Sequence, residues 1–162
     1  MPNEKKYTIV QILLLGIVAL FLQIFFIPII KIGVCQPDLI LLVVIFLGYR
    51  FGVIEGIIGG FILGLLQDSI SASTLGVSSL ANCIIGFIAG QTKQFKMTIN
   101  AKVLIFIILI LVHGGIFYIF YQIKTETTYV YLIMTRVFPN TVYTFVIGLL
   151  TSFFMRSKFN NI

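Results

Sequence analysis

The few ionisable residues of this 162-residue chain stand inside or at the edges of long apolar runs. Asp38 opens one run, Asp68 closes the next, and Arg136 lies early in the last one. A charge surrounded by apolar material must pair with an opposite charge or face a cavity. We therefore predict that Arg136 pairs with Asp38, with Asp68 or with both, as a structural clamp or as one wall of a polar pocket.

Pro139 marks a second polar feature in the last apolar run. It removes one backbone hydrogen bond and so predicts a kink. Asn140, Thr141 and Thr144 follow it, and their side chains suit the polar groups that a kink frees. The predicted polar membrane cluster is Asp38, Asp68, Arg136 and Asn140.

Catalytic and metal chemistry lack the residues that they need. Two carboxylates can perform acid–base catalysis, but no nucleophile lies beside a base in this sequence. Cys35 and Cys83 form no Cys-x-x-Cys pair, and His113 is the single histidine. We predict no enzyme activity, no metal and no cofactor. His113 is expected to form a hydrogen bond to a neighbouring helix, with titration near neutral pH as the alternative.

The composition identifies the elements that hold these residues as membrane helices. Hydrophobic residues make up 59% of the chain and charged residues 10%, whereas soluble domains carry about 25% charged residues. Soluble, disordered and disulfide-scaffold classes are thereby excluded. The net charge of +6 comes from residues in short connections, which favours membrane topology over nucleic-acid binding. We predict one all-α integral membrane domain, residues 1–162, in the lipid bilayer.

Six transmembrane helices are predicted, at about 9–30, 38–48, 52–67, 75–90, 103–123 and 131–155. The run 39–66 is ambiguous, because one long helix would place Arg50 and Glu55 at mid-membrane. Two short helices that turn at 48–52 avoid this and are preferred. Both charged residues then lie at a cytoplasmic turn, where we expect a local ion pair.

The distribution of lysines and arginines predicts the orientation. With six helices and a cytoplasmic N-terminus, eight positive residues lie inside and two outside. The cytoplasmic residues are Lys5, Lys6, Arg50, Lys93, Lys96, Lys102, Arg156 and Lys158, and the external ones are Lys31 and Lys124. A five-helix topology gives six against three and buries Arg50. Both termini are therefore predicted to be cytoplasmic.

Small residues recur every four positions in the third and fourth predicted helices. Positions four apart share one face of a helix, and a glycine face lets another backbone approach closely. The predicted packing residues are Gly52, Gly56, Gly60, Gly64, Gly86 and Gly90. They either pack these two helices together or form a docking face for a transmembrane helix of another protein.

Four motifs follow one another between residues 36 and 90. They are a Pro-Asp start at 37–38, a Gly-x-Arg-x-Gly turn at 48–52, a Gly-Leu-Leu-x-Asp end at 64–68 and a Leu-Gly pair at 75–76. In these motifs, and in the glycines that recur every four residues from Gly52 to Gly64 (the glycine ladder), the chain resembles the MreD family of rod shape-determining proteins. The rest of the chain agrees with that family in hydropathy.

The resemblance implies a fold similar to the substrate-binding subunits of energy-coupling-factor vitamin transporters. It also implies a non-catalytic, multi-pass protein of the bacterial cytoplasmic membrane, in the complex that elongates rod-shaped cells. The expected partner is MreC, a single-span protein with an external domain. Further expected partners are a RodA-type glycosyltransferase, a class B penicillin-binding protein and MreB. The chain would help to direct lateral peptidoglycan synthesis.

Two alternatives stay open. A substrate-binding subunit of a vitamin transporter would fit six helices and an external pocket. Its usual Ala-x-x-x-Ala pattern is missing, since the first helix offers only Gly16 and Ala19. A small ion or proton carrier would depend on Asp38, Asp68 and His113.

Overall fold

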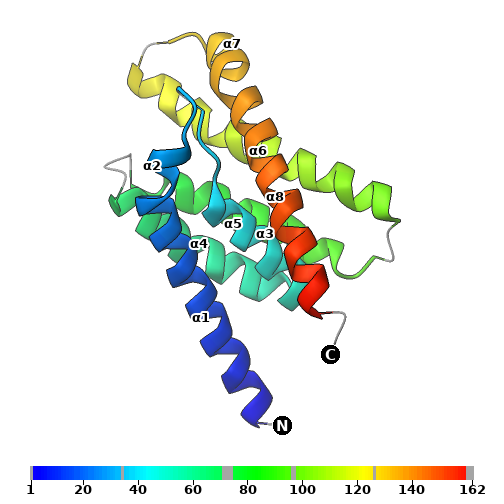
Figure 1. The fold of residues 1–162 in the computed structure, drawn as a ribbon. Helices are drawn as coiled ribbons and strands as arrows, with labels where there is room; N and C mark the ends of the chain where they lie inside the picture. Colours follow the sequence, from blue (N-terminus) through cyan, green and yellow to red (C-terminus); the bar gives the residue numbers. More distant parts are fainter. Residues whose placement is uncertain (1, 34, 71–74, 96–97, 126, 160–162) are drawn as a thin grey trace.

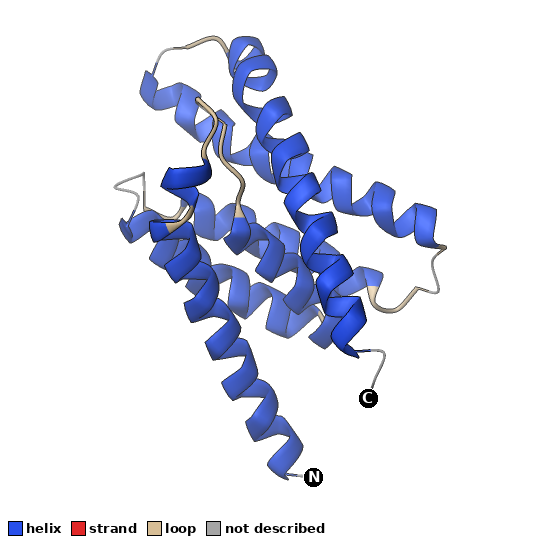
Figure 2. Cartoon of the chain, in the orientation of Figure 1, coloured by secondary structure: helices blue, strands red, loops and turns tan. Residues whose placement is uncertain are grey.

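The described part of the chain is helical throughout its regular elements (Figure 1; Figure 2). The computed structural model describes residues 2–33, 35–70, 75–95, 98–125 and 127–159. The elements are α1 (Pro2–Phe25), α2 (Ile27–Ile30), α3 (Leu39–Phe51), α4 (Val53–Ile70), α5 (Val77–Thr92), α6 (Ile99–Thr125), α7 (Tyr129–Leu132), the π-helical η1 (Ile133–Val137) and α8 (Phe138–Phe159).

Six apolar helical segments occur in this part of the chain, in the order that the sequence predicts. Three are long and apolar enough to cross a membrane, namely Val53–Ile70, Ile99–Ile123 and Tyr129–Thr151. Three are shorter, namely Leu14–Phe25, Leu39–Phe51 and Val77–Thr92. The all-helical architecture is that of a membrane protein, whereas crossing by all six segments stays a prediction.

The run 39–66 contains two helices, but the turn between them is shorter than expected. A turn of five residues was predicted at 48–52, whereas α3 continues to Phe51 and α4 begins at Val53. Gly52 alone makes the turn, with a φ of 129° that side-chain-bearing residues rarely adopt. The Gly52 N–H still donates to the Gly48 carbonyl, and the Gly56 N–H donates to the Gly52 carbonyl. Helical hydrogen bonding therefore reaches the turn from both sides.

The centre of the molecule is formed by α3, α4 and α5, and the closest packing joins α4 to α5. Glycines make this packing possible. A methyl group added at Gly56 would lie 2.5 Å from the Gly86 carbonyl oxygen, and one at Gly60 would lie 2.5 Å from the Asn82 carbonyl oxygen. At Gly64 it would lie 2.5 Å from the Cα atom of Ser79.

The facing glycines of α5 are equally enclosed. A methyl group at Gly86 would meet the backbone of Gly56, and one at Gly90 would meet the backbone of Val53. The glycine ladder is therefore an internal seam between α4 and α5. It is not open to a helix of another protein, so the docking interpretation of this face is wrong. The reason is that the chain's own next helix already occupies it.

The remaining helices cover this centre. α1 contacts α3 and α4, while α6 contacts α5, α3 and α8. Buried apolar side chains of α3 face both groups. Ile40, Val44 and Leu47 belong to the cluster that α1 covers, and Leu41 and Ile45 belong to the cluster that α6 covers. The helix α3 is therefore enclosed on two sides, which fits its almost wholly apolar sequence.

The outer surfaces of these helices are apolar. On α1, Leu14, Ile17, Phe21 and Phe25 are exposed, and α4, α6 and α8 carry similar residues. Such continuous apolar surface is not stable in water and is suited to lipid or to a protein partner.

One end of the molecule gathers positive residues. Lys93 Nζ donates to the Phe51 carbonyl oxygen at 2.9 Å, which brings the end of α5 to the end of α3. Lys102 Nζ lies 5.4 Å from the centre of the Tyr49 ring, and Arg50 lies in the last turn of α3. Lys96 lies outside the described residues.

Candidate functional site

The linker between α2 and α3 positions the first functional residue. Asp38 is the N-cap residue of α3, and its Oδ1 accepts a hydrogen bond from the Leu41 N–H at 2.9 Å. Asp is among the preferred residues at this position because it satisfies a free backbone N–H group. The second oxygen, Oδ2, accepts from Gln67 Nε2 of α4 at 3.3 Å. The backbone N–H of Asp38 donates to Thr144 Oγ1 of α8 at 3.2 Å.

Gln23 of α1 holds the same linker from the other side. Its Nε2 donates to the Pro37 carbonyl oxygen at 3.4 Å, and its Oε1 accepts from the Leu39 N–H at 2.8 Å. The side-chain amide thus satisfies one acceptor and one donor of an irregular backbone segment. Irregular backbone within a membrane protein needs such internal partners, since lipid supplies none.

The polar stretch of α8 follows a π-helical segment rather than a plain kink. The Phe138 N–H donates to the Ile133 carbonyl, five residues earlier, directly before Pro139. π-helical turns of this kind re-aim the side chains that follow them. Thr141 Oγ1 donates to the Val137 carbonyl oxygen at 2.7 Å, within its own helix.

Asn140 connects three separate parts of the chain. Its Oδ1 accepts from the Gln36 N–H at 3.0 Å, and its Nδ2 donates to the Tyr118 hydroxyl of α6 at 3.3 Å. Asn140 and Thr144 were expected to satisfy their own helix, but they reach the α2–α3 linker instead. They reach it because both residues lie on the face of α8 that meets the linker.

Asp68 performs a different task from Asp38. It is only 1% exposed, and its carboxylate accepts from the backbone N–H groups of Gly76 at 2.8 Å, Ser78 at 3.1 Å and Ser79 at 3.4 Å. Gly76, the N-cap residue of α5, has no side chain to cap the helix. Asp68 supplies the missing acceptor, and its negative charge suits the positive end of the helix dipole.

The predicted ion pairs are corrected by these contacts. Within the described residues, no ion pair joins Arg136 to Asp38 or to Asp68. The two carboxylates instead accept hydrogen bonds from donors of α3, of α4 and of the start of α5. Arg136 lies on η1. The expected pair of Arg50 and Glu55 is likewise not formed among the residues placed here, where both side chains are exposed.

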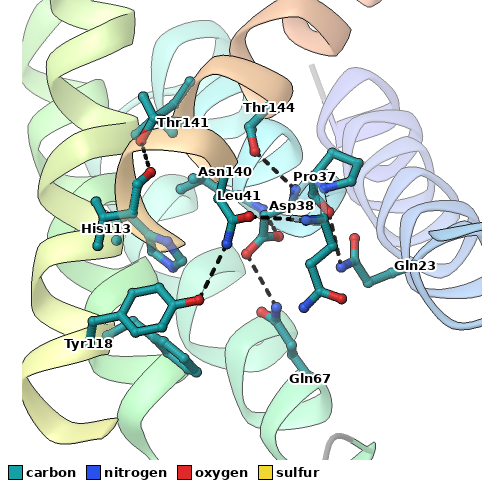
Figure 3. A pocket seen from close by; sticks show the side chains of 15 residues that line it. Gln23, Pro37, Asp38, Leu41, Gln67, His113, Tyr118, Asn140, Thr141 and Thr144 are labelled. Atoms are coloured by element: carbon teal, nitrogen blue, oxygen red, sulfur yellow. Dashed lines mark hydrogen bonds between the residues drawn. The ribbon is translucent and has the colours of Figure 1, made fainter. Parts of the chain in front are cut away.

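These residues enclose a cavity of about 90 Å³, here called the polar cavity (Figure 3). Its polar lining comprises Gln23, Gln36, Asp38, Gln67, His113, Tyr118, Asn140, Thr141 and Thr144. Figure 3 shows the His113 ring and the Asp38 carboxylate on opposite sides of it. His113 is 7% exposed, and its buried Nε2 has no partner among the described residues. The Nε2 atom therefore does not form the hydrogen bond to a neighbouring helix that was expected of His113.

A second hollow adjoins the first and is here called the apolar groove. Its volume is about 230 Å³. The lining residues are Leu20, Gln23, Ile24, Pro28, Gln36, Ile40, Gln67 and Ile70. Gln23, Gln36 and Gln67 line both hollows, so the two meet at these three side chains.

Sequence reasoning missed these glutamines. The available signal was their type, since an uncharged amide in or beside an apolar run needs a polar partner. Gln67 shows what that signal leaves out. Its Nε2 meets Asp38, and its Oε1 accepts from Asn82 Nδ2 at 3.5 Å, contacts that depend on helix packing.

The chemistry available at the polar cavity is hydrogen bonding. Hydroxyl, amide and carboxylate groups line it, and no lysine or arginine does. In the part of the chain that is described, no cluster of three or more histidine, cysteine or acidic residues is suited to a metal ion.

Comparison with known proteins identifies a family. Residues 3–161 match the family model described as rod shape-determining protein MreD. No curated protein and no solved structure matches the chain.

Proposed function

Since the chain belongs to the MreD family of rod shape-determining proteins, we propose that it is a non-catalytic component of the bacterial cell-elongation complex. The match over residues 3–161 is the observation that carries this proposal. The helical, apolar architecture supports it, because a protein with short connections offers its helix faces to lipid and to partners.

We propose further that all six apolar segments cross the cytoplasmic membrane, with both termini in the cytoplasm. Figure 1 supports this, since the first turns of α1 and the last turns of α8 lie at the same end of the molecule. The cluster of Arg50, Lys93 and Lys102 would then face the cytoplasm, as the positive-inside rule requires. The helix α3 has 13 residues and so measures ~20 Å, less than the ~30 Å hydrocarbon core. The α2–α3 linker completes that crossing inside the protein.

The proposed direct partner is MreC. Because the glycine seam is internal, the single span of MreC would contact outward-facing apolar side chains of the outer helices. A RodA-type glycosyltransferase, a class B penicillin-binding protein and the MreB filament would be reached in the same complex. The chain would thereby help to direct lateral peptidoglycan synthesis without performing it.

Depletion of this protein in its own host tests the proposal. Rod-shaped cells are expected to widen and round as the protein is lost, and a plasmid-borne copy should restore their shape. Affinity purification of the tagged protein from gently solubilised membranes should recover MreC. Normal rods in the absence of the protein, together with purifications that lack MreC, would exclude the proposed role.

A vitamin-transporter subunit remains the second candidate, and the polar cavity is the observation that favours it. The size of the polar cavity alone argues the other way. Pockets for drug-sized ligands measure about 300–1,000 Å³, whereas the polar cavity measures about 90 Å³ and reaches the lower end of that range only together with the adjoining groove of about 230 Å³. The expected fold similarity to such subunits also stays a prediction. A vitamin-like molecule that remains bound through purification would support this candidate.

A further inference from the structure

The polar cavity and the apolar groove differ in the side chains that line them and meet at one boundary. Nine of the fifteen residues that line the polar cavity have hydrogen-bonding side chains, whereas five of the eight that line the groove are apolar and the other three are the shared glutamines. We propose that the cavity and the groove together bind one neutral membrane amphiphile. Its small hydroxyl- or amide-bearing head occupies the polar cavity, and its hydrocarbon chain lies in the apolar groove. This inference is independent of the role in cell shape.

The groove has the opening that a hydrocarbon chain needs and room for part of one, with the rest extending from the mouth into the bilayer. Its volume of about 230 Å³ exceeds the ~150 Å³ of an apolar cavity that admits benzene. Ile24 on one side is 38% exposed, and Pro28 and Ile70 are exposed too. The mouth therefore opens on the outer surface between α1 and α4, where lipid chains are the surrounding solvent.

The charges of the polar cavity select the head. Its titratable groups are Asp38, His113 and Tyr118, and no lysine or arginine lines it. A phosphate or carboxylate head would meet the Asp38 carboxylate, and the lining itself offers no lysine or arginine to neutralise it, since Arg136 acts on Tyr118 from outside the lining. An uncharged hydroxyl or amide instead fits a wall of amides and hydroxyls. It could also supply the partner that His113 Nε2 lacks within the described chain.

The boundary between the hollows suits an amphiphile better than water alone. Water fills buried polar cavities wherever it finds several polar partners. Water in the polar cavity would gain nothing from a hydrocarbon groove beside it. An amphiphile needs both, with its polar–apolar junction at Gln23, Gln36 and Gln67. The experiment therefore has to separate ligands that use the groove from those that do not.

Native mass spectrometry of the full-length protein in detergent provides the measurement. The probes are 1-monooleoylglycerol and oleoyl-lysophosphatidylglycerol, which share one oleoyl chain and differ in the charge of the head. The neutral probe is expected to bind with 1:1 stoichiometry and at least tenfold more tightly than the anionic one. Equal affinity for the two probes, or no saturable binding of the neutral one, would overturn the proposal.

Substitutions at both hollows locate the binding. Ile24→Trp fills the groove and should weaken binding of monooleoylglycerol at least tenfold. Ile17→Trp is the matched control, because it places the same side chain on the same helix at a site 61% exposed and outside the groove. It should leave the affinity unchanged. If Ile24→Trp does not fold, Ile70→Trp at the opposite wall replaces it. Unchanged binding in the folded groove variant would overturn the proposal.

The variant His113→Phe tests the polar cavity, because it should weaken ligand binding without lowering the stability of the protein. The variant keeps the volume of a ring and removes the nitrogen that has no partner. Binding of monooleoylglycerol should weaken about tenfold, while the melting temperature of the ligand-free protein stays equal or rises, because a buried unsatisfied group has gone. Unaltered affinity would remove His113 and the polar cavity from the site.

Discussion

At the scale of single residues, Asp68 holds the N-terminus of α5. It accepts hydrogen bonds from the backbone N–H groups of Gly76, Ser78 and Ser79, and so caps a helix whose N-cap residue, Gly76, has no side chain. Asp68→Ala leaves these buried donors without an acceptor and should destabilise the protein by about 1–3 kcal/mol. Thermal unfolding in detergent measures the loss. Ser69→Ala, at the exposed neighbouring position, is the control and should change little. An equally small effect at both positions would show that Asp68 is not a cap.

The sequence located Asp38 and Asp68 at helix ends but not their partners. Charge pattern alone favoured an ion pair with Arg136. Which acceptor a free helix N-terminus uses depends on the geometry of the connection before it, as at Gly76. For the same reason, the sequence could not predict the roles of Gln23, Gln36 and Gln67, or that His113 Nε2 has no hydrogen-bond partner within the described residues. Their environment is created by contacts between α1, α4, α6 and α8.

At the scale of elements, the seam between α4 and α5 is set by glycine. Gly60→Ala brings a methyl group to 2.5 Å from the Asn82 carbonyl oxygen, so the two backbones must move apart. We expect a destabilisation of about 1–3 kcal/mol, the usual range for overpacking. Gly115→Ala is the matched control, because the nearest atom to its methyl group is the Tyr129 hydroxyl oxygen at 3.5 Å. Equal melting temperatures for the two variants would contradict the close packing of α4 against α5 at Gly60.

Helix positions followed from apolar run length, whereas several boundaries did not. The predicted turn at 48–52 became a single residue, because one glycine with positive φ reverses the chain while helical hydrogen bonds continue around it. The short α2 and the π-helical η1 were also not predicted. Pro28 and Pro139 mark where the helix departs from regularity, but side-chain packing decides the form that the departure takes.

At the scale of the whole molecule, the orientation can be measured directly. In a background with Cys35→Ser and Cys83→Ser, single cysteines are placed at Gln94 and Thr128, both exposed. An impermeant thiol reagent added to intact cells should label Thr128→Cys and spare Gln94→Cys, since the segment after α5 is predicted to be cytoplasmic. Permeabilised cells should show labelling at both sites. The reverse pattern in intact cells would invert the proposed topology.

The single-residue turn at Gly52 also bears on how the chain enters the membrane. The helix α3 measures ~20 Å and ends directly at the turn into α4. A nascent chain that has reached only Phe51 therefore holds a hydrophobic segment too short to settle across the bilayer alone. Once α4 has left the ribosome, the two helices can leave the translocon together as a hairpin. We therefore expect residues 39–70 to insert as one unit, with the glycine seam between α4 and α5 forming only after α5 has followed.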